Sequence, residues 1–476
     1  MAGRWSVRPR SAASLVSSAR RCELAETPPE SLRPSHTAGE PIETPSLGDL
    51  AKRASMWSAF GFVSSQGIRL VANIILTRYV SPEVFGLMAM TQTFLMALEM
   101  FSDVGIGPNI VQNKHGDEPA FYNTAWSMAV IRGFVLFLLS CAGAYPVAMF
   151  FDQPVLIWVI PACGFSCVIA GFHSTSLAIM NRHLDMMPST IVDIASQILT
   201  FSMTFLWAKQ HPTVWAMVVG TTCGYLFRCV VSHVILPGHS NWFRWHRDHA
   251  RSMIRFGKWV FLSTGLLFFV AQADKIMQGK FEDASRLGVY GIAVGFVGLA
   301  PTLIKRLSGV VLFPVLSTVV RERPEDLPRV FRKVRVVLLA VAMGIILPLI
   351  IGGRLLVEFI YPPQYWDAGW MLQYLSTGAM VTAVCCSIGP LFFALGHTYV
   401  NTVLMVTHLA LLIAAGLIGH AVGGEKGFVI GIASVELLNY PVYAWFLSQR
   451  KLWQPERDFA AFGIALVALY VGRTWF

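Results

Sequence analysis

The chain contains little charge. Only 13% of its 476 residues are charged, against about a quarter in soluble proteins. Hydrophobic residues make up 55% of the chain, and the mean hydropathy is +0.57. Apolar runs of about 20 residues, the length that crosses a bilayer, follow one another from Met56 almost to Phe476. This pattern excludes a soluble protein, and we expect an all-α polytopic membrane protein.

The chain also lacks the cysteine pattern of a metal site. Its eight cysteines lie almost entirely in apolar stretches, without paired Cys-x-x-Cys spacing. We therefore expect them to be small core residues, and we expect neither a metal nor a cofactor.

Residues 1–46 have no apolar run long enough for the hydrophobic region of a signal peptide. They are rich in Arg, Ser and Pro, a composition typical of disorder. We expect a disordered cytoplasmic tail. A transit peptide and an upstream start codon chosen in error are alternatives for the same segment.

Hydropathy predicts twelve membrane-spanning helices and a thirteenth near the C-terminus. The expected spans are 55–77, 84–107, 120–143, 147–171, 188–208, 213–236, 256–277, 287–318, 331–352, 368–395, 399–420, 428–448 and 459–475. The joints between them are short. No outer loop is long enough for the catalytic domain of a membrane polymerase or ligase.

Loop charges predict the orientation. With the N-terminus in the cytoplasm, two inner joints are strongly basic, and the outer joints 150–154, 209–212 and 423–427 carry little positive charge. This is the distribution expected from the positive-inside rule, and it explains the net charge of +10 without nucleic acid. The basic inner-joint residues are Arg244, Arg247, Arg251, Arg255 and Lys258 in the first, and Arg321, Arg323, Arg329, Arg332, Lys333 and Arg335 in the second.

An internal repeat divides the spans into halves. Phe60-Gly61 in the first span is followed by Phe85-Gly86-Leu87, and Phe256-Gly257 in the seventh is followed by Leu287-Gly288-Val289. Halves of six helices each are typical of carriers built from parallel repeats. We expect two six-helix lobes, at 47–240 and 241–448, with an extra C-terminal helix at 449–476.

Basic residues inside the spans are the first class of candidate site residues. A charge in a bilayer is costly, so it usually lines a pathway or pairs with another charge. Guanidinium groups suit phosphate oxygens, and a cavity holding an anionic phosphate or pyrophosphate headgroup is the functional interpretation. Pairing with buried carboxylates, or snorkelling to the interface, is the structural alternative. The candidates are Arg69, Arg132, Arg228, Arg306, Lys275 and Lys305.

Carboxylates inside the spans are the second class. Glu436, Asp193 and Asp274 are candidates for ion coupling, with Glu436 favoured because it lies mid-helix. Glu99 and Asp103 are four residues apart and share a helix face; for Asp103 we favour a structural role. We predict no catalytic residue.

Two segments resemble a known family. The segment ILTRYVSPEVFGLMAM followed by FSDVGIGPNIVQ is similar to the first two helices of the polysaccharide transporter branch of the MOP exporter superfamily, the Wzx-type flippases. The segment FGKWVFLSTGLLFFVAQADKIMQGKF followed by LGVYGIAVGF resembles the seventh and eighth helices of that family. Hydropathy extends the resemblance over about residues 50–476.

The resemblance implies two six-helix bundles in a V shape that work by alternating access. It implies that an undecaprenyl-pyrophosphate-linked oligosaccharide is flipped across the bacterial inner membrane for polysaccharide biosynthesis, without enzymatic chemistry. Membrane lipids, and a polysaccharide polymerase with export machinery, are the expected partners. Members of the family have a cationic cavity, for which Arg69, Arg132, Arg228 and Arg306 are the candidates here. A multidrug or cation antiporter of the same superfamily and a polymerase or ligase for lipid-linked sugars are the alternatives.

Overall fold

The structure is a computed structural model that describes residues 47–103, 105–236 and 239–475. The expected tail at 1–46, which includes Cys22, lies outside these residues. Residues 50–476 form one compact unit, and within the described residues it is built from helices without a strand. The fold class predicted from hydropathy is therefore confirmed.

Most predicted spans of the first half are single helices. The helices are α1 (Leu47–Leu76), α2 (Pro82–Phe101), α3 (Ile106–Gln112), α4 (Pro119–Phe151), α5 (Leu156–Gly171), α6 (Ser176–Arg182), α7 (Met187–Gln210) and α8 (Val214–Val234).

The second half begins with a long helix that follows the basic joint. Its helices are α9 (Arg247–Phe281), α10 (Ala284–Val297), α11 (Leu299–Leu307), the π-helical turn η2 (Ser308–Leu312), α12 (Phe313–Glu322), α13 (Leu327–Ile360), α14 (Ala368–Cys385), α15 (Ile388–Ala394), α16 (Thr398–Gln449) and α17 (Pro455–Trp475). Short 3-10 turns, η3 (Pro324–Asp326) and η4 (Pro363–Tyr365), flank α13.

Among the described residues, nine helices are long and apolar enough to span a membrane, or ten if the bent pair of α5 and α6 is one span. One of the nine, α16, covers two predicted spans. Its backbone leaves helical geometry at Gly423 and at Gly424, where φ is +58°, a conformation that glycine adopts without strain. Outside this set, α9 and α17 have 35 and 21 residues, respectively, long enough to cross a bilayer.

Some predicted boundaries are wrong. The third span was expected to end at 143, yet α4 continues through Pro146 to Phe151. A proline inside a helix leaves a backbone carbonyl without its hydrogen bond, but neighbouring groups in a membrane protein can supply a partner. The second span was expected to reach 107, yet α2 ends at Phe101. There the Asp103 carboxylate accepts the backbone N–H of Gly105, at 2.8 Å, in a tight turn.

Glycines bring the two halves together. In residues 50–476, α2 and α10 pack closely against each other near their N-terminal ends. A Cβ atom at Gly86 would overlap the carbonyl oxygen of Ala284, and one at Gly288 would overlap that of Pro82. These are the glycines of the two sequence repeats, and each meets the equivalent turn of the other half.

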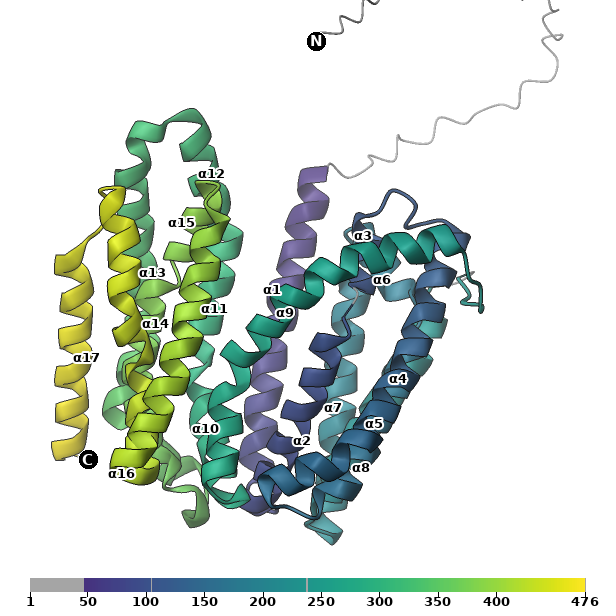
Figure 1. Cartoon of the computed structure of the whole chain (residues 1–476), viewed down its shortest axis with the longest axis horizontal. Helices are drawn as coiled ribbons and strands as arrows, with labels where there is room; N and C mark the ends of the chain where they lie inside the picture. Colours follow the sequence, from purple (N-terminus) through teal and green to yellow (C-terminus); the bar gives the residue numbers. More distant parts are fainter. Residues whose placement is uncertain (1–46, 104, 237–238, 476) are drawn as a thin grey trace, which may run out of the picture. The chain divides into compact units, whose positions relative to one another are not determined.

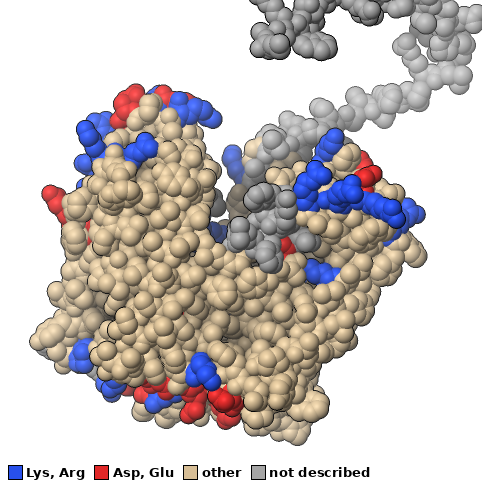
Figure 2. Space-filling model, in the orientation of Figure 1, with Lys and Arg blue, Asp and Glu red and all other residues tan. Residues whose placement is uncertain are grey.

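One end of the unit is therefore closed, and we define this closed end by Pro82, Ala284 and Tyr365. A single apolar cluster there combines side chains of α2, α5 and α8 with those of α10, α13 and α14. At the opposite end there are two separate apolar clusters: one joins first-half helices with the start of α9, and the other is built from α12, α13, α15 and α16. Figure 1 shows the helices diverging toward that end, and the surface in Figure 2 is notched between them. We call it the open end.

The open end is the basic one. Figure 2 shows many Lys and Arg side chains gathered there over the start of α9 and the joint between α12 and α13, with a few Asp and Glu side chains among them; the closed end shows fewer charged side chains, of both signs. Most arginines of the two predicted basic joints are exposed. Arg335 is the exception: it is 1% exposed, inside α13, and its guanidinium lies 3.0 Å from Asp458 of α17. Its assignment to an exposed inner joint was wrong.

Candidate functional site

The first feature of the site is a polar seam between the halves. On α1, the residues spaced at three or four positions share one helix face, and this face meets a similarly spaced face of α10 and α11. The α1 residues are Ser58, Phe62, Gln66, Arg69 and Asn73, and those opposite are Gly295, Leu299, Thr302 and Arg306.

A cavity of about 230 Å³ lies in this seam, with Arg69 in its wall. Gln66, Asn73, Thr302 and Tyr361 supply the other polar groups, and no acidic side chain is among the described residues that line it. A cationic wall without a carboxylate suits an anionic ligand.

Arg306 lies in the same seam and joins its two sides. Its guanidinium donates to the carbonyl oxygen and the hydroxyl of Ser58, at 2.6 and 2.7 Å. It also stacks on the Phe62 ring, with 4.6 Å between the guanidinium carbon and the ring centroid. The structure thus brings Arg69 and Arg306 together on one seam.

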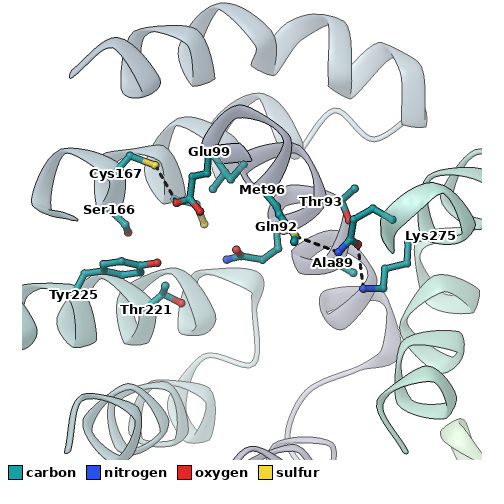
Figure 3. A pocket seen from close by; sticks show the side chains of 13 residues that line it. Ala89, Gln92, Thr93, Met96, Glu99, Ser166, Cys167, Thr221, Tyr225 and Lys275 are labelled. Atoms are coloured by element: carbon teal, nitrogen blue, oxygen red, sulfur yellow. Dashed lines mark hydrogen bonds between the residues drawn. The ribbon is translucent and has the colours of Figure 1, made fainter. Parts of the chain in front are cut away.

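The second feature is a polar cavity of about 350 Å³ among α2, α5, α8 and α9. Figure 3 shows Glu99 and Gln92 of α2 and Tyr225 of α8 pointing into the same space. Lys275 of α9 completes the cavity and donates to the Gln272 amide oxygen at 3.1 Å.

Arg132 of α4 lies beside this cavity. It donates from Nε to the Ser102 hydroxyl at 3.0 Å and from Nη2 to the backbone oxygen of Glu99 at 2.7 Å. A cation at the C-terminus of a helix is stabilised by the helix dipole and by the unpaired carbonyls of the last turn. Arg132 therefore caps α2 at the turn that places the Glu99 carboxylate in the cavity.

Arg228 has a carboxylate partner. Its guanidinium on α8 lies 2.8 Å from Asp193 of α7, and both side chains are partly exposed. This ion pair joins two neighbouring helices of the first half. Pairing with a carboxylate is the structural alternative described for intramembrane arginines. Because Asp193 is paired with Arg228, it is not grouped with the other two predicted coupling residues.

Asp274 and Glu436 line one cavity of about 220 Å³ in the second half. Asp274 accepts the hydroxyl of Tyr290 at 2.9 Å. Glu436 lies 3.2 Å from His408 Nδ1, and its Oε2 has no hydrogen-bond partner among the described residues. Lys305 shares a neighbouring cavity of about 680 Å³ with Glu436 and His408.

Several cavity residues were not predicted. His408 is one of them, and its distance from Glu436 makes it part of a polar pair. Tyr225 and Gln272 are uncharged and carried no signal beyond their place in apolar helices. Within the described part of the chain, no group of three or more His, Cys, Asp or Glu side chains is arranged to hold a metal ion.

Comparisons with known proteins agree with this architecture. The family described as "Polysaccharide biosynthesis protein" matches residues 75–369. The lipopolysaccharide biosynthesis protein WzxC of Escherichia coli K12 is 21% identical over 83% of this chain and 80% of its own length. The succinoglycan biosynthesis transport protein ExoT of Rhizobium meliloti is 20% identical over 72% of this chain and 68% of its own.

Solved structures show the same fold. The lipid II flippase MurJ in an inward closed conformation has a TM-score of 0.68 at 13% identity, covering 89% of this chain and 93% of that one. An inward-facing multidrug resistance MATE transporter of the MOP superfamily has a TM-score of 0.64 at 12% identity, covering 83% and 95%, respectively. The family match spans more than half of the chain. The chain therefore belongs to the polysaccharide biosynthesis protein family.

Proposed function

We propose that this chain flips an undecaprenyl-pyrophosphate-linked oligosaccharide across the bacterial inner membrane by alternating access. Family membership makes it a membrane transport protein of polysaccharide biosynthesis. The observation that carries the finer proposal is the cavity around Arg69, which is cationic and lies between the two halves. A headgroup bound there would touch both halves.

The charge of the open end supports the proposal that this end of the molecule faces the cytoplasm. Lys and Arg side chains concentrate at that end, and the positive-inside rule places such an end in the cytoplasm. The N-terminus would then be cytoplasmic, because α1 begins at the same end. In this orientation the structure would accept substrate from the inner leaflet.

The membrane potential favours outward movement of such a substrate. An anion leaving a negative cytoplasm gains about 2.3 kcal/mol per charge per 100 mV. Arg69 and Arg306 are the proposed headgroup contacts, while Arg132, Arg228, Lys275 and Lys305 contribute positive potential nearby. Glu436 and Asp274 are the proposed ion-coupling pair, and Asp193 is a further candidate. Polymerase and export machinery would receive the product.

The test replaces Arg69 in a strain that depends on this chain. Arg69→Gln removes the charge from the wall of the seam cavity, and we expect surface polysaccharide to fall at least tenfold, because a hydrogen bond to a charged group contributes about 1.5–3 kcal/mol. Arg78→Gln is the matched control, since Arg78 is exposed in the turn after α1. Unchanged polysaccharide in Arg69→Gln, with normal protein in the membrane, would refute the proposal.

A further inference from the structure

We infer that the cavity among α2, α5, α8 and α9 binds a neutral sugar, the part of the glycan that lies next to the headgroup. This inference rests on the proposed function. Six of the thirteen residues that line the cavity have neutral hydrogen-bonding side chains, including one unpartnered buried hydroxyl and one aromatic ring. These polar residues are Gln92, Thr93, Ser166, Thr221, Tyr225 and Gln272.

The charge of the cavity argues against the headgroup as its occupant. Glu99 and Lys275 are the charged residues in its described lining, one of each sign. A pyrophosphate would meet the Glu99 carboxylate without a surplus of positive charge. A neutral ligand with many hydroxyls gains from both groups, because a hydroxyl donates to a carboxylate and accepts from an ammonium group.

Several polar groups in the cavity are poorly satisfied. The Ser166 side chain is buried, and its hydroxyl has no partner among the described residues. Gln272, also buried, donates its amide to the sulfur of Met96 at 3.1 Å, and a thioether is a weak acceptor. An unsatisfied buried polar group costs about 1–3 kcal/mol. Ligand hydroxyls would be better partners than those present.

The aromatic residue supplies the apolar contact that a sugar ring requires. Tyr225 has an apolar ring and a polar hydroxyl, and Figure 3 shows that hydroxyl directed toward Gln92 and Glu99. The carbon-bound hydrogens of a sugar can pack on such a ring while its hydroxyls reach the amide and the carboxylate. The three side chains come from two helices, so they form a site rather than one helix face.

Size and position agree with a sugar beside the headgroup. A volume of about 350 Å³ is at the small end of ligand pockets, roughly 300–1,000 Å³, and suits a short part of a glycan. Arg132 bonds the backbone of Glu99 at 2.7 Å, so a cation lies directly beside the cavity. This cation adds to the positive potential near the sugar, while the headgroup itself is proposed to contact Arg69 and Arg306.

The test compares two lipids on the full-length protein in lipid nanodiscs. One is the lipid-linked repeat unit extracted from the producing strain, and the other is undecaprenyl pyrophosphate without a glycan. We expect wild-type protein to bind both and to prefer the glycan-bearing lipid. Tyr225→Leu and Gln92→Leu should weaken binding of the glycan-bearing lipid about tenfold and leave the bare lipid unchanged.

Control variants separate the possible outcomes. Tyr145→Leu, on the exposed surface of α4, should bind both lipids as the wild type does, and Tyr225→Phe tests the hydroxyl with less risk to folding. Arg69→Gln should weaken both lipids alike. Equal effects of the cavity variants on both lipids, or no effect on either, would overturn the sugar site and leave the proposed function standing. A wild-type protein that binds neither lipid would overturn both.

Discussion

At the residue scale, charged residues that all lie in apolar helices have different roles. Their positions in the sequence do not show these roles. Arg69 lies in a cavity without acidic lining among the described residues. Arg228 is paired with Asp193, and Arg132 caps α2. A charge in a membrane usually pairs with another group or lines a pathway. Arg228 and Arg132 have partners, whereas Arg69 lines a cavity.

Arg335 and Asp458 form the most deeply buried ion pair described, with side chains 2% and 0% exposed. Asp458 also accepts the hydroxyl of Tyr440 at 2.7 Å. Removing one partner leaves an uncompensated buried charge, which costs about 3–5 kcal/mol. We therefore expect Arg335→Met to lower the melting temperature of the purified protein strongly.

The double variant Arg335→Met/Asp458→Leu should recover much of that loss, because an apolar pair of similar volume can replace a buried ion pair. Thermal unfolding in detergent measures both proteins. If the single and double variants melted together, the pair would not be what holds α17 against α13.

A histidine outside the spans gives a pH dependence. His239, in the joint between α8 and α9, lies 3.0 Å from the Thr175 hydroxyl, and burial lowers the pKa of His239 below its usual 6.5. The folded protein therefore favours neutral His239. This preference stabilises the fold fully above pH 6.5, and the stabilisation is lost as the pH falls below that value. We expect the melting temperature of the wild type to drop on acidification.

Replacing His239 by Gln should flatten the part of this dependence that begins near pH 6.5. Thermal unfolding of both proteins at a series of pH values from 8 downward is the measurement. Parallel curves for the wild type and His239→Gln would show that other groups cause the loss.

At the element scale, the crossing of α2 and α10 holds the closed end. A Cβ atom added at Gly288 would overlap the carbonyl of Pro82. A Cβ atom added at Gly291, one turn further along α10, would meet no atom of another element within 4 Å. We expect Gly288→Leu to separate the helices and to reduce the folded protein recovered. Gly291→Leu, the matched control, should be tolerated. Similar yields of the two variants would show that close approach at Gly288 is not required.

The elements also show what could be predicted from sequence. Runs of apolar residues predicted the helices well, because a bilayer requires a fixed length of uncharged chain. The repeat glycines were visible as a pattern, but their mutual contact was not. Helix ends were missed where local chemistry decides them, as at the Asp103 turn that ends α2.

The candidate site was less predictable because it depends on contacts distant in sequence. Arg335 and Asp458 are 123 residues apart, and neither the spacing nor the hydropathy of the chain relates them. The Tyr225 cavity is formed by residues from four helices, most of them uncharged. Intramembrane charge indicated where polar groups gather, and the fold was needed to show which of them share a cavity.

At the scale of the whole molecule, the fold of residues 50–476 is closed at one end and notched at the other, as alternating access requires of one of its states. Lys280 and Asp152 link the two halves across the closed end, with 3.0 Å between Nζ and the carboxylate. Cysteines at these two positions, joined by a short thiol-reactive linker, should keep that end closed. We expect polysaccharide export to stop and to resume when the linker is cleaved, and continued export in the linked protein would argue against opening there.

The central claim is that the chain carries a lipid-linked glycan between leaflets and that Arg69, in the wall of the seam cavity, contacts its headgroup. The most direct measurement is the fraction of lipid-linked repeat units that an impermeant glycan-modifying reagent reaches from the outer face of the inner membrane. We predict that this fraction is near zero when the chain is deleted, is restored by the wild type and by Arg78→Gln, and stays near zero with Arg69→Gln. Repeat units that reach the outer face as readily in the deletion strain would contradict the account.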